Sequence, residues 1–310
     1  MAGGTRSASG LPGSLARYAE LVRVPNLFTA PPDVLLGAAL AAGTGAGVPL
    51  GGVAGLAVAS VLLYAGGTAL NDAFDAPSDA TERPERPIPS GRVSRRTGFG
   101  LGALFLTCGV AAAGLAAGVG GGVAAAAVAT GVLLYDGALK GGPVGFATMG
   151  AVRGLNVLLG TTAATGAAVA LSASGAGVVL AVTAYVAAVT YMADAETRTG
   201  ERGRVLVAAA GAVVATAALL GRLLLAAPTL PEAAATLALG AGFGAWIAGP
   251  LRRAYRSPDP GTVGSAVGKC VLGLVILDAA FVATVGPGWA VAIAAFLLPA
   301  VGLERRFDVS

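Results

Sequence analysis

The sequence predicts an all-α integral membrane protein, a bundle of about nine to ten transmembrane helices. Of its 310 residues, 55% are hydrophobic and only 12% are charged, whereas soluble domains carry about 25% charged residues. The mean hydropathy is +0.79. The 49 glycines suit closely packed helices, because small residues let transmembrane helices approach one another. Apolar and polar residues do not alternate in ~10-residue blocks, which excludes a β-barrel.

The individual elements follow from the apolar stretches, since a helix needs about 20 apolar residues to cross a bilayer. Residues 1–14 are small and polar and are expected to form a disordered N-terminal tail. Residues 15–26 are expected to form a short interfacial helix. The predicted spans are 27–46, 52–73, 98–117, 119–136, 145–166, 174–193, 204–225, 232–250, 265–285 and 288–303. Only Gly286-Pro287-Gly288 separates the last two, so nine spans are the alternative to ten.

The basic residues are distributed asymmetrically over these spans. With ten spans and a cytoplasmic N-terminus, Arg153, Arg222 and Lys269 fall within spans, and the other 17 of the 20 Lys and Arg residues fall in cytoplasmic segments. Because Lys and Arg are enriched in the cytoplasmic loops of membrane proteins, the net charge of +4 reflects topology and no nucleic-acid partner is expected. The polar loops 74–97 and 193–204 then face the cytoplasm.

A group of acidic residues interrupts the apolar sequence at the end of the second predicted span. Asp72, Asp75 and Asp79 are spaced i, i+3 and i+7, so they share one face of a helix. The next arginines along the loop are Arg83, Arg86 and Arg92. Mg²⁺ favours one or two carboxylates together with phosphate oxygens, and basic side chains bind the remaining phosphate oxygens. The pattern therefore indicates a site for a Mg²⁺-bound diphosphate, whereas an ordinary basic loop would not explain three aspartates in phase.

Histidine is absent. This removes the commonest general base and metal ligand of proteins. Any chemistry must therefore use carboxylates, Lys and Arg, with or without a metal ion.

The stretch 71-NDAFDAPSDATERPERPIPSG-91 resembles the first signature of the UbiA superfamily of intramembrane prenyltransferases. Similar matches are Arg23-x-Pro25-Asn26 before the first span, Tyr135 to Lys140 after the fourth, and the acidic segment 191-YMADAETRTGERGR-204 after the sixth. The resemblance covers residues 15–310 as one domain. It implies helices around a central cavity, with polar caps on the cytoplasmic side. It also implies an enzyme that uses Mg²⁺ to transfer an isoprenoid chain from a prenyl diphosphate to a small hydrophobic or aromatic acceptor.

Specific roles follow from this resemblance and from the neighbouring charges. The metal ligands are expected to be Asp72, Asp75, Asp79, Asp194 and Glu196. The diphosphate-binding residues are expected to be Asn71, Arg83, Arg86, Lys140, Arg202 and Arg204. The cavity or acceptor residues are expected to be Arg23, Asn26, Arg153 and Asn156. An interhelical polar pair is the alternative for Arg153 and Asn156, and a topology anchor is the alternative for Lys140. Asp33 and Asp278 are each predicted to pair with an arginine.

Two departures from the family pattern affect these expectations. Pro77 removes a helix N–H and interrupts helices, so Asp79 is expected to leave the face that Asp72 and Asp75 share. The second acidic segment usually has two aspartates about four residues apart in the family, but here position 198 is Arg. This change supports a second possible function, in which a catalytically altered UbiA-like protein binds or carries a lipid-like or aromatic molecule.

The composition also suggests where the protein acts. A sequence rich in Ala, Gly and Arg is typical of a GC-rich bacterial genome, so the predicted location is the bacterial plasma membrane, with the active-site loops in the cytoplasm. The expected partners are a prenyl diphosphate, a hydrophobic or aromatic acceptor and membrane lipid. The sequence does not determine the acceptor, the prenyl chain length or the oligomeric state.

Overall fold

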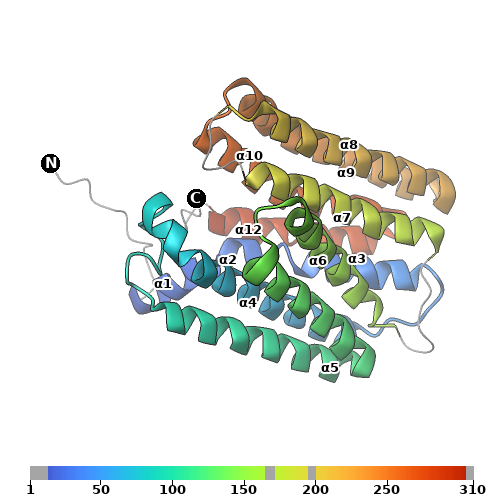
Figure 1. Ribbon diagram of the computed structural model, residues 1–310. Coiled ribbons are helices and arrows are strands. Elements are labelled where there is room, and N and C mark those ends of the chain that lie inside the picture. The colour runs from blue at the N-terminus through green and yellow to red at the C-terminus, as the bar shows by residue number, and fades with distance from the viewer. Residues whose placement is uncertain (1–12, 165–171, 195–199, 305–310) are drawn as a thin grey trace.

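The chain folds into a bundle of helices (Figure 1). The computed structural model describes residues 13–164, 172–194 and 200–304, and within these ranges every regular element is a helix. The helices are α1 (Gly13–Leu21), α2 (Val24–Leu27), α3 (Pro31–Ala42), α4 (Leu50–Glu82), α5 (Arg95–Leu134), the π-helix η1 (Tyr135–Leu139), α6 (Pro143–Thr161), α7 (Ala173–Ala193), α8 (Arg202–Ala226), α9 (Leu230–Arg256), α10 (Pro260–Ala283), α11 (Pro287–Ala294) and α12 (Leu297–Glu304). The predicted all-helical class is confirmed.

Six segments of the described residues are long and apolar enough to cross a membrane. They are Leu50–Glu82, Arg95–Leu139, Ala173–Ala193, Arg202–Ala226, Leu230–Arg256 and Pro260–Ala283. The predicted count of nine to ten spans is therefore not confirmed, because stretches 27–46, 145–166 and 288–303 do not appear among the six. In the first of these, α3 has only 12 residues. It starts at Pro31, a residue type favoured at helix starts, and ends before a glycine-rich turn.

The long helix α5 contains a reversal of direction at Ala117 and Gly118. Gly118 has φ 64° and ψ −157°, a conformation that glycine adopts far more readily than other residues. A Cβ atom on Gly122 would lie 3.6 Å from the Cα atom of Gly114, although residues eight apart in a straight helix are about 12 Å apart. The chain therefore turns back on itself at the break predicted between stretches 98–117 and 119–136.

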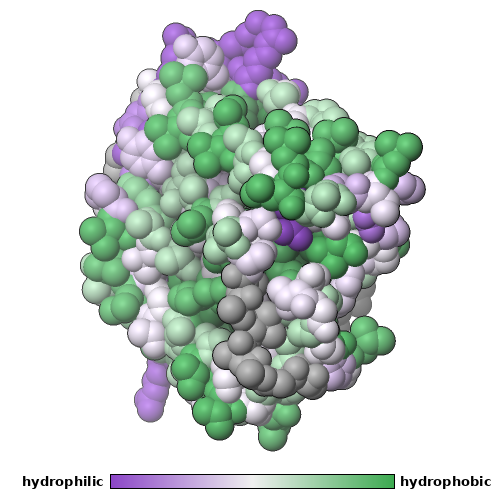
Figure 2. Space-filling model, turned by 90° about the vertical axis from the view of Figure 1, so that its right-hand side faces the viewer, coloured by the Kyte–Doolittle hydropathy of each residue, from purple (hydrophilic) through white to green (hydrophobic). Residues whose placement is uncertain are grey.

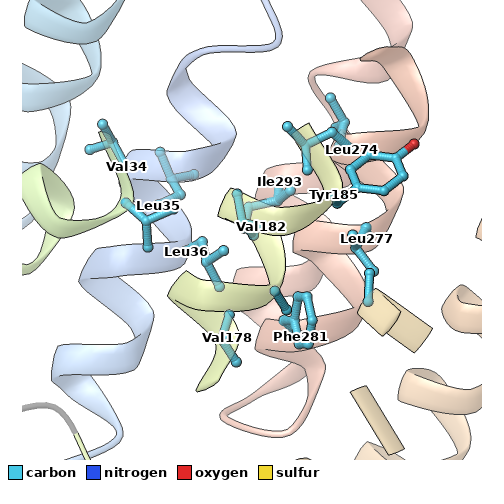
Figure 3. Close-up of a cluster of buried hydrophobic side chains, with 14 of the residues drawn as sticks. Val34, Leu35, Leu36, Val178, Val182, Tyr185, Leu274, Leu277, Phe281 and Ile293 are labelled. Atoms are coloured by element: carbon cyan, nitrogen blue, oxygen red, sulfur yellow. The ribbon is translucent and has the colours of Figure 1, made fainter. Parts of the chain in front are cut away.

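The centre of the bundle is formed by α3, α7 and α10. Every residue of α3 from Pro31 to Ala41 is buried, and so is every residue of α10 from Leu272 to Ala283. Figure 3 shows Leu36 of α3, Val182 of α7 and Phe281 of α10 in this core. A helix that is apolar on all sides is enclosed by other helices. Polar side chains on α3 and α10 must therefore find partners within the protein.

Backbone contact fixes how α3 crosses α6. A Cβ atom on Gly37 would lie 1.9 Å from the Val157 carbonyl oxygen, and a Cβ atom on Gly160 would lie 2.1 Å from the Val34 carbonyl oxygen. Glycine is required at both positions for so close an approach. This crossing brings the polar side chains of the two helices together in the middle of the bundle.

Successive helices run in opposite directions, so the ends of α4, α7 and α9 lie at the same end of the bundle as the starts of α6, α8 and α10 (Figure 1). The opposite end shows mostly apolar or neutral side chains (Figure 2). Its described connections, 43–49, 162–164, 227–229 and 284–286, contain no charged residue. The polar and apolar ends agree with the predicted charge asymmetry. The cytoplasmic orientation of the polar end stays a prediction.

Candidate active site

The first aspartate motif lies on the last turns of α4, which continues unbroken from Leu50 to Glu82 with Pro77 inside it. The expectation that Asp79 leaves the face shared with Asp72 is wrong. A single guanidinium nitrogen, Arg86 Nη1, lies 2.8 Å from Asp79 Oδ2 and 3.6 Å from Asp72 Oδ1. Both carboxylates are buried. Pro77 therefore leaves these two aspartates together on one face.

A contact from α5 explains why the proline does not break α4. Proline provides no N–H for the carbonyl four residues earlier, which here belongs to Ala73. The Ala73 carbonyl oxygen instead accepts a hydrogen bond of 2.8 Å from Arg95 Nε. Because the arginine replaces the missing donor, no buried carbonyl is left unsatisfied and the helix continues to Glu82.

Arg23, which lies between α1 and α2, contacts the first aspartate motif. Its Nη2 atom donates to Asp72 Oδ1 at 2.9 Å. The predicted interfacial helix over 15–26 is interrupted here, because α1 ends at Leu21, α2 begins at Val24, and Arg23 has φ 50°. A positive φ is uncommon outside glycine and such backbone strain is concentrated at functional sites. The interruption places the Arg23 side chain against α4.

The segment after α5 supplies two more contacts to α4. Lys140 forms an ion pair with Asp75, and Asn71 Nδ2 donates to Asp136 Oδ1 at 2.8 Å. Asp136 belongs to η1, a π-helix, and such segments occur frequently at functional sites. Lys140 is thus an ion-pair partner of the first aspartate motif.

The second acidic segment approaches this group from the end of α7. Arg204 Nη1 lies 2.6 Å from Asp194 Oδ2 and donates to the Tyr191 carbonyl at 3.1 Å. The Tyr135 hydroxyl lies within electrostatic reach of Asp194 and of Asp75. The two acidic segments therefore lie at the same end of the bundle. Glu196, the other expected ligand, lies outside the described residues.

Three further expected site residues are Arg202, Arg83 and Asn26. Arg202 is exposed, and its guanidinium lies 5.8 Å from the centre of the Tyr255 ring. Arg83 is half-buried at the end of α4, where its backbone N–H donates to the Asp79 carbonyl at 2.8 Å. Asn26 is half-buried in the short helix α2. Their roles in ligand binding stay predictions.

Arg153 and Asn156 lie deeper, in a separate network between α3, α4 and α6. Arg153 Nε is 3.2 Å from Asp33 Oδ2, and Asn156 Nδ2 donates to the same oxygen at 2.9 Å. Ser60 Oγ donates to Asn156 Oδ1 at 2.9 Å. The interhelical pair is thus the observed arrangement, and the predicted arginine partner of Asp33 is confirmed. Asp278 is fully buried beside Asp33 and within electrostatic reach of Arg153.

The sequence interpretation missed Asp136, although it included Lys140 four residues later. Asp136 is buried and bonded to Asn71. Its signal in the sequence is an ionisable residue at the end of an apolar stretch, which is costly in a membrane and usually functional. The bond to Asn71 could not be read from the sequence, because 65 residues separate the two partners.

Asp72, Asp75, Asp79 and Asp194 each contact at least one base at this end. In the described residues, no three acidic or cysteine side chains are grouped so that they could hold a metal ion by themselves. Mg²⁺ usually keeps several waters and combines one or two carboxylates with substrate phosphate oxygens. The donor set therefore fits Mg²⁺ that binds together with a diphosphate, which would provide both the missing oxygens and new partners for the displaced bases.

The fold and this site define a multi-pass helical membrane protein with carboxylates and bases gathered at one end of the bundle. The model of the UbiA prenyltransferase family matches residues 32–269, and the chain belongs to that family. The resemblance found in the sequence is thereby confirmed.

Curated relatives are named digeranylgeranylglyceryl phosphate synthase. The protein of Methanopyrus kandleri is 41% identical over 131 residues, which are 41% of this chain and 45% of the relative. The protein of Ignicoccus hospitalis is 44% identical over 81 residues, 26% of this chain and 25% of the relative. The chain thus spans less than half of the length of either relative. Both sources are archaeal, so these relatives do not support the bacterial origin inferred from composition.

Solved structures share the fold. A UbiA homologue from Aeropyrum pernix K1 superimposes with a TM-score of 0.67 at 21% identity, covering 82% of this chain and 96% of that one. A digeranylgeranylglyceryl phosphate synthase structure gives 0.59 at 18% identity, covering 88% and 99%. A homologue from Archaeoglobus fulgidus, bound to GPP and Mg²⁺, gives 0.50 at 12% identity, covering 93% and 99%.

Proposed function

We propose that this protein is a Mg²⁺-dependent prenyltransferase that transfers an isoprenoid chain from a prenyl diphosphate to the hydroxyl group of a prenylated glycerol phosphate in the membrane. The observation that supports this best is the convergence of Asp72, Asp75 and Asp79 with Arg23, Arg86 and Lys140. Such a site matches a multiply charged, metal-bound anion. Structures with the same fold contain GPP or DMAPP with Mg²⁺.

The names of the relatives favour a glycerol phosphate as the acceptor. Digeranylgeranylglyceryl phosphate contains two isoprenoid chains on one glyceryl phosphate, so its synthase joins a chain to a glycerol-based lipid. The aromatic acceptor expected from the wider family is the alternative. Diphosphate release with each class of acceptor distinguishes the two.

In the proposed mechanism, the bases exchange the carboxylates for phosphate oxygens when the donor binds. Asp72 and Asp75 would hold Mg²⁺ together with the diphosphate oxygens, and the ion when bound neutralises charge on the diphosphate. Arg23, Arg86 and Lys140 stabilise the negative charge that develops as the allylic C–O bond breaks. The acceptor oxygen forms the new bond to the prenyl carbon, diphosphate leaves with the bonding electrons, and the hydroxyl proton passes to solvent or to diphosphate.

The altered second motif supports a different candidate function, a UbiA-like protein that binds or carries a lipid without transferring a chain. Asp194 is paired with Arg204 in this structure, and the position where a second aspartate is usual is Arg198. A protein of this kind would bind a prenylated ligand stoichiometrically and release no diphosphate.

The deciding experiment measures diphosphate release by purified protein in detergent. The donors are geranyl, farnesyl and geranylgeranyl diphosphate, and the acceptors are geranylgeranylglyceryl phosphate and a phenolic panel, each with Mg²⁺ or EDTA. Release that needs Mg²⁺ and the glycerol lipid, with the expected product mass, supports the proposal. Release only with phenols supports an aromatic acceptor. Binding without release under every condition supports the carrier, and Asp72→Asn is the matched inactive variant.

A further inference from the structure

Two matched contacts join α4 to the segment that begins at η1. Asn71 and Asp75 lie one helical turn apart on α4, and they meet Asp136 and Lys140, which are also four residues apart. Asp136 lies in η1 and Lys140 directly follows it, and both side chains face α4. This local geometry aligns both pairs.

The chemistry of the Asn71–Asp136 pair restricts how Asn71 is oriented. An ionised carboxylate only accepts hydrogen bonds, whereas an asparagine amide has a donating NH₂ group and an accepting oxygen. Asn71 therefore turns its Nδ2 atom toward Asp136, at 2.8 Å. Its Oδ1 atom must then point away from Asp136. Since Asp136 is only 9% exposed, water competes little for this bond.

We propose that Asp136 is a positioning residue, which fixes the Asn71 amide so that its oxygen rather than its NH₂ group is offered to the metal–diphosphate ligand. This inference rests on the proposed function. It also revises the expectation that Asn71 binds diphosphate directly, because an oxygen acceptor repels phosphate oxygens and suits Mg²⁺ or a water bound to it. Asp136 contacts Asn71 directly and has Lys140, Asp75 and Arg23 within electrostatic reach.

A purely structural role is the competing explanation, in which Asp136 only fastens η1 to α4. The two roles differ in what they do to anion binding. Fixing the amide of Asn71 affects only the binding that involves a metal ion. If Asp136 instead holds η1 against α4, it also positions Lys140. Removing Asp136 would then weaken pyrophosphate binding both with and without metal.

The test is a double-mutant cycle with Asp136→Ala, Asn71→Ala and the double variant in detergent-purified full-length protein. Mn²⁺ binding in the presence of inorganic pyrophosphate is followed by EPR, without acceptor or turnover. We expect each single variant to weaken Mn²⁺ binding about tenfold, equivalent to about 1.4 kcal/mol. The double variant should bind no more weakly than Asn71→Ala, since Asp136 acts through that amide. Asp136→Asn, which permits either amide orientation, should fall between wild type and Asp136→Ala.

Control measurements distinguish the positioning role of Asp136 from a purely structural role. Glu85→Ala removes an exposed acidic side chain from the same polar loop and should leave Mn²⁺ binding unchanged. Pyrophosphate binding in EDTA, measured by calorimetry, should be unchanged in Asp136→Ala. Additive losses in the double variant, an unchanged Asp136→Ala, or an equal loss of metal-free binding would each overturn the positioning role. A wild-type protein that binds no Mn²⁺ with pyrophosphate would overturn this inference together with the proposed function.

Discussion

Two groups of paired charges lie in different surroundings. The polar-end cluster consists of Asp72, Asp75 and Asp79 with Arg23, Arg86 and Lys140. The mid-bundle network consists of Asp33, Arg153, Asn156 and Ser60. At the polar end, Asp72 pairs with Arg23, whose side chain is 28% exposed, and Asp75 pairs with Lys140, which is 34% exposed. In the middle of the bundle, the side chain of Asp33 is completely buried and that of Arg153 is 10% exposed. Both regions join helices through an acid and a base.

The difference in exposure separates a site that can exchange partners from one that cannot. A base near water can leave its carboxylate for a phosphate, because solvent and the incoming ligand offset the lost ion pair. A buried pair has no such replacement, and removing one member leaves an uncompensated charge. The polar-end cluster therefore suits ligand binding, and the mid-bundle network suits the positioning of α3 against α6.

The largest expected effect on stability comes from Asp33→Ala. The substitution removes the carboxylate that pairs with Arg153 and leaves the buried Asp278 within its electrostatic reach, and breaking a buried ion pair costs about 3–5 kcal/mol. Thermal unfolding in detergent should show a large fall in Tm. Asp75→Ala, at the polar end, is the comparison variant and should cause a smaller fall, because Asp75 and its partner Lys140 are 21% and 34% exposed. Equal falls for the two variants would contradict the distinction between the regions.

The largest expected effect on activity comes from Asp72→Asn. The substitution removes a negatively charged ligand of the proposed Mg²⁺, and weaker stabilisation of the charge that develops on diphosphate lowers kcat by about 10²–10³, which diphosphate release measures directly. The Tm should change little, because the released Arg23 can reach water. If activity survived in Asp72→Asn, the polar-end cluster would not be the reaction site.

A glycine substitution tests the packing of α3 against α6, which positions the mid-bundle network. In Gly160→Ala the new Cβ atom would lie 2.1 Å from the Val34 carbonyl oxygen, and overpacking of this kind costs about 1–3 kcal/mol. Gly100→Ala is the matched helical control, with no atom within 4 Å of the added Cβ, and it should be neutral or stabilising by up to about 1 kcal/mol. Unfolding of both variants under the same conditions tests this, and a tolerated Gly160→Ala would show that the α3–α6 contact can relax.

The smallest effect is expected for Arg202→Ala. Arg202 is exposed and stacks on Tyr255, a contact worth about 0.5–1 kcal/mol at such sites, so turnover should be unchanged. Arg204→Ala removes the partner of Asp194, and a hydrogen bond to a charged group contributes about 1.5–3 kcal/mol, so diphosphate release should fall at least several-fold. Equal turnover in the two variants would remove Arg204 from the proposed site.

Much of the fold and of the candidate site could be predicted because the signals are local. Long apolar stretches predicted helices in a membrane, and the 72, 75 and 79 spacing predicted a shared face that the structure retains. Prediction failed where a distant contact changed a local rule. Arg95 supplies the donor that Pro77 lacks, and the φ of Arg23 divides the expected N-terminal helix. Asp136 was missed because its partner lies on another helix.

The sequence by itself determined the helical class, the polar and apolar ends, and the acids and bases available for a diphosphate site, because these depend on composition and near-neighbour spacing. Only the tertiary structure decided which acid meets which base. It pairs Asp33 with Arg153 beyond the reach of water and Asp72 with Arg23 near the surface. Those partners are set by helix crossings such as the Gly37–Gly160 contact, and burial then decides whether an ion pair can be exchanged for a ligand.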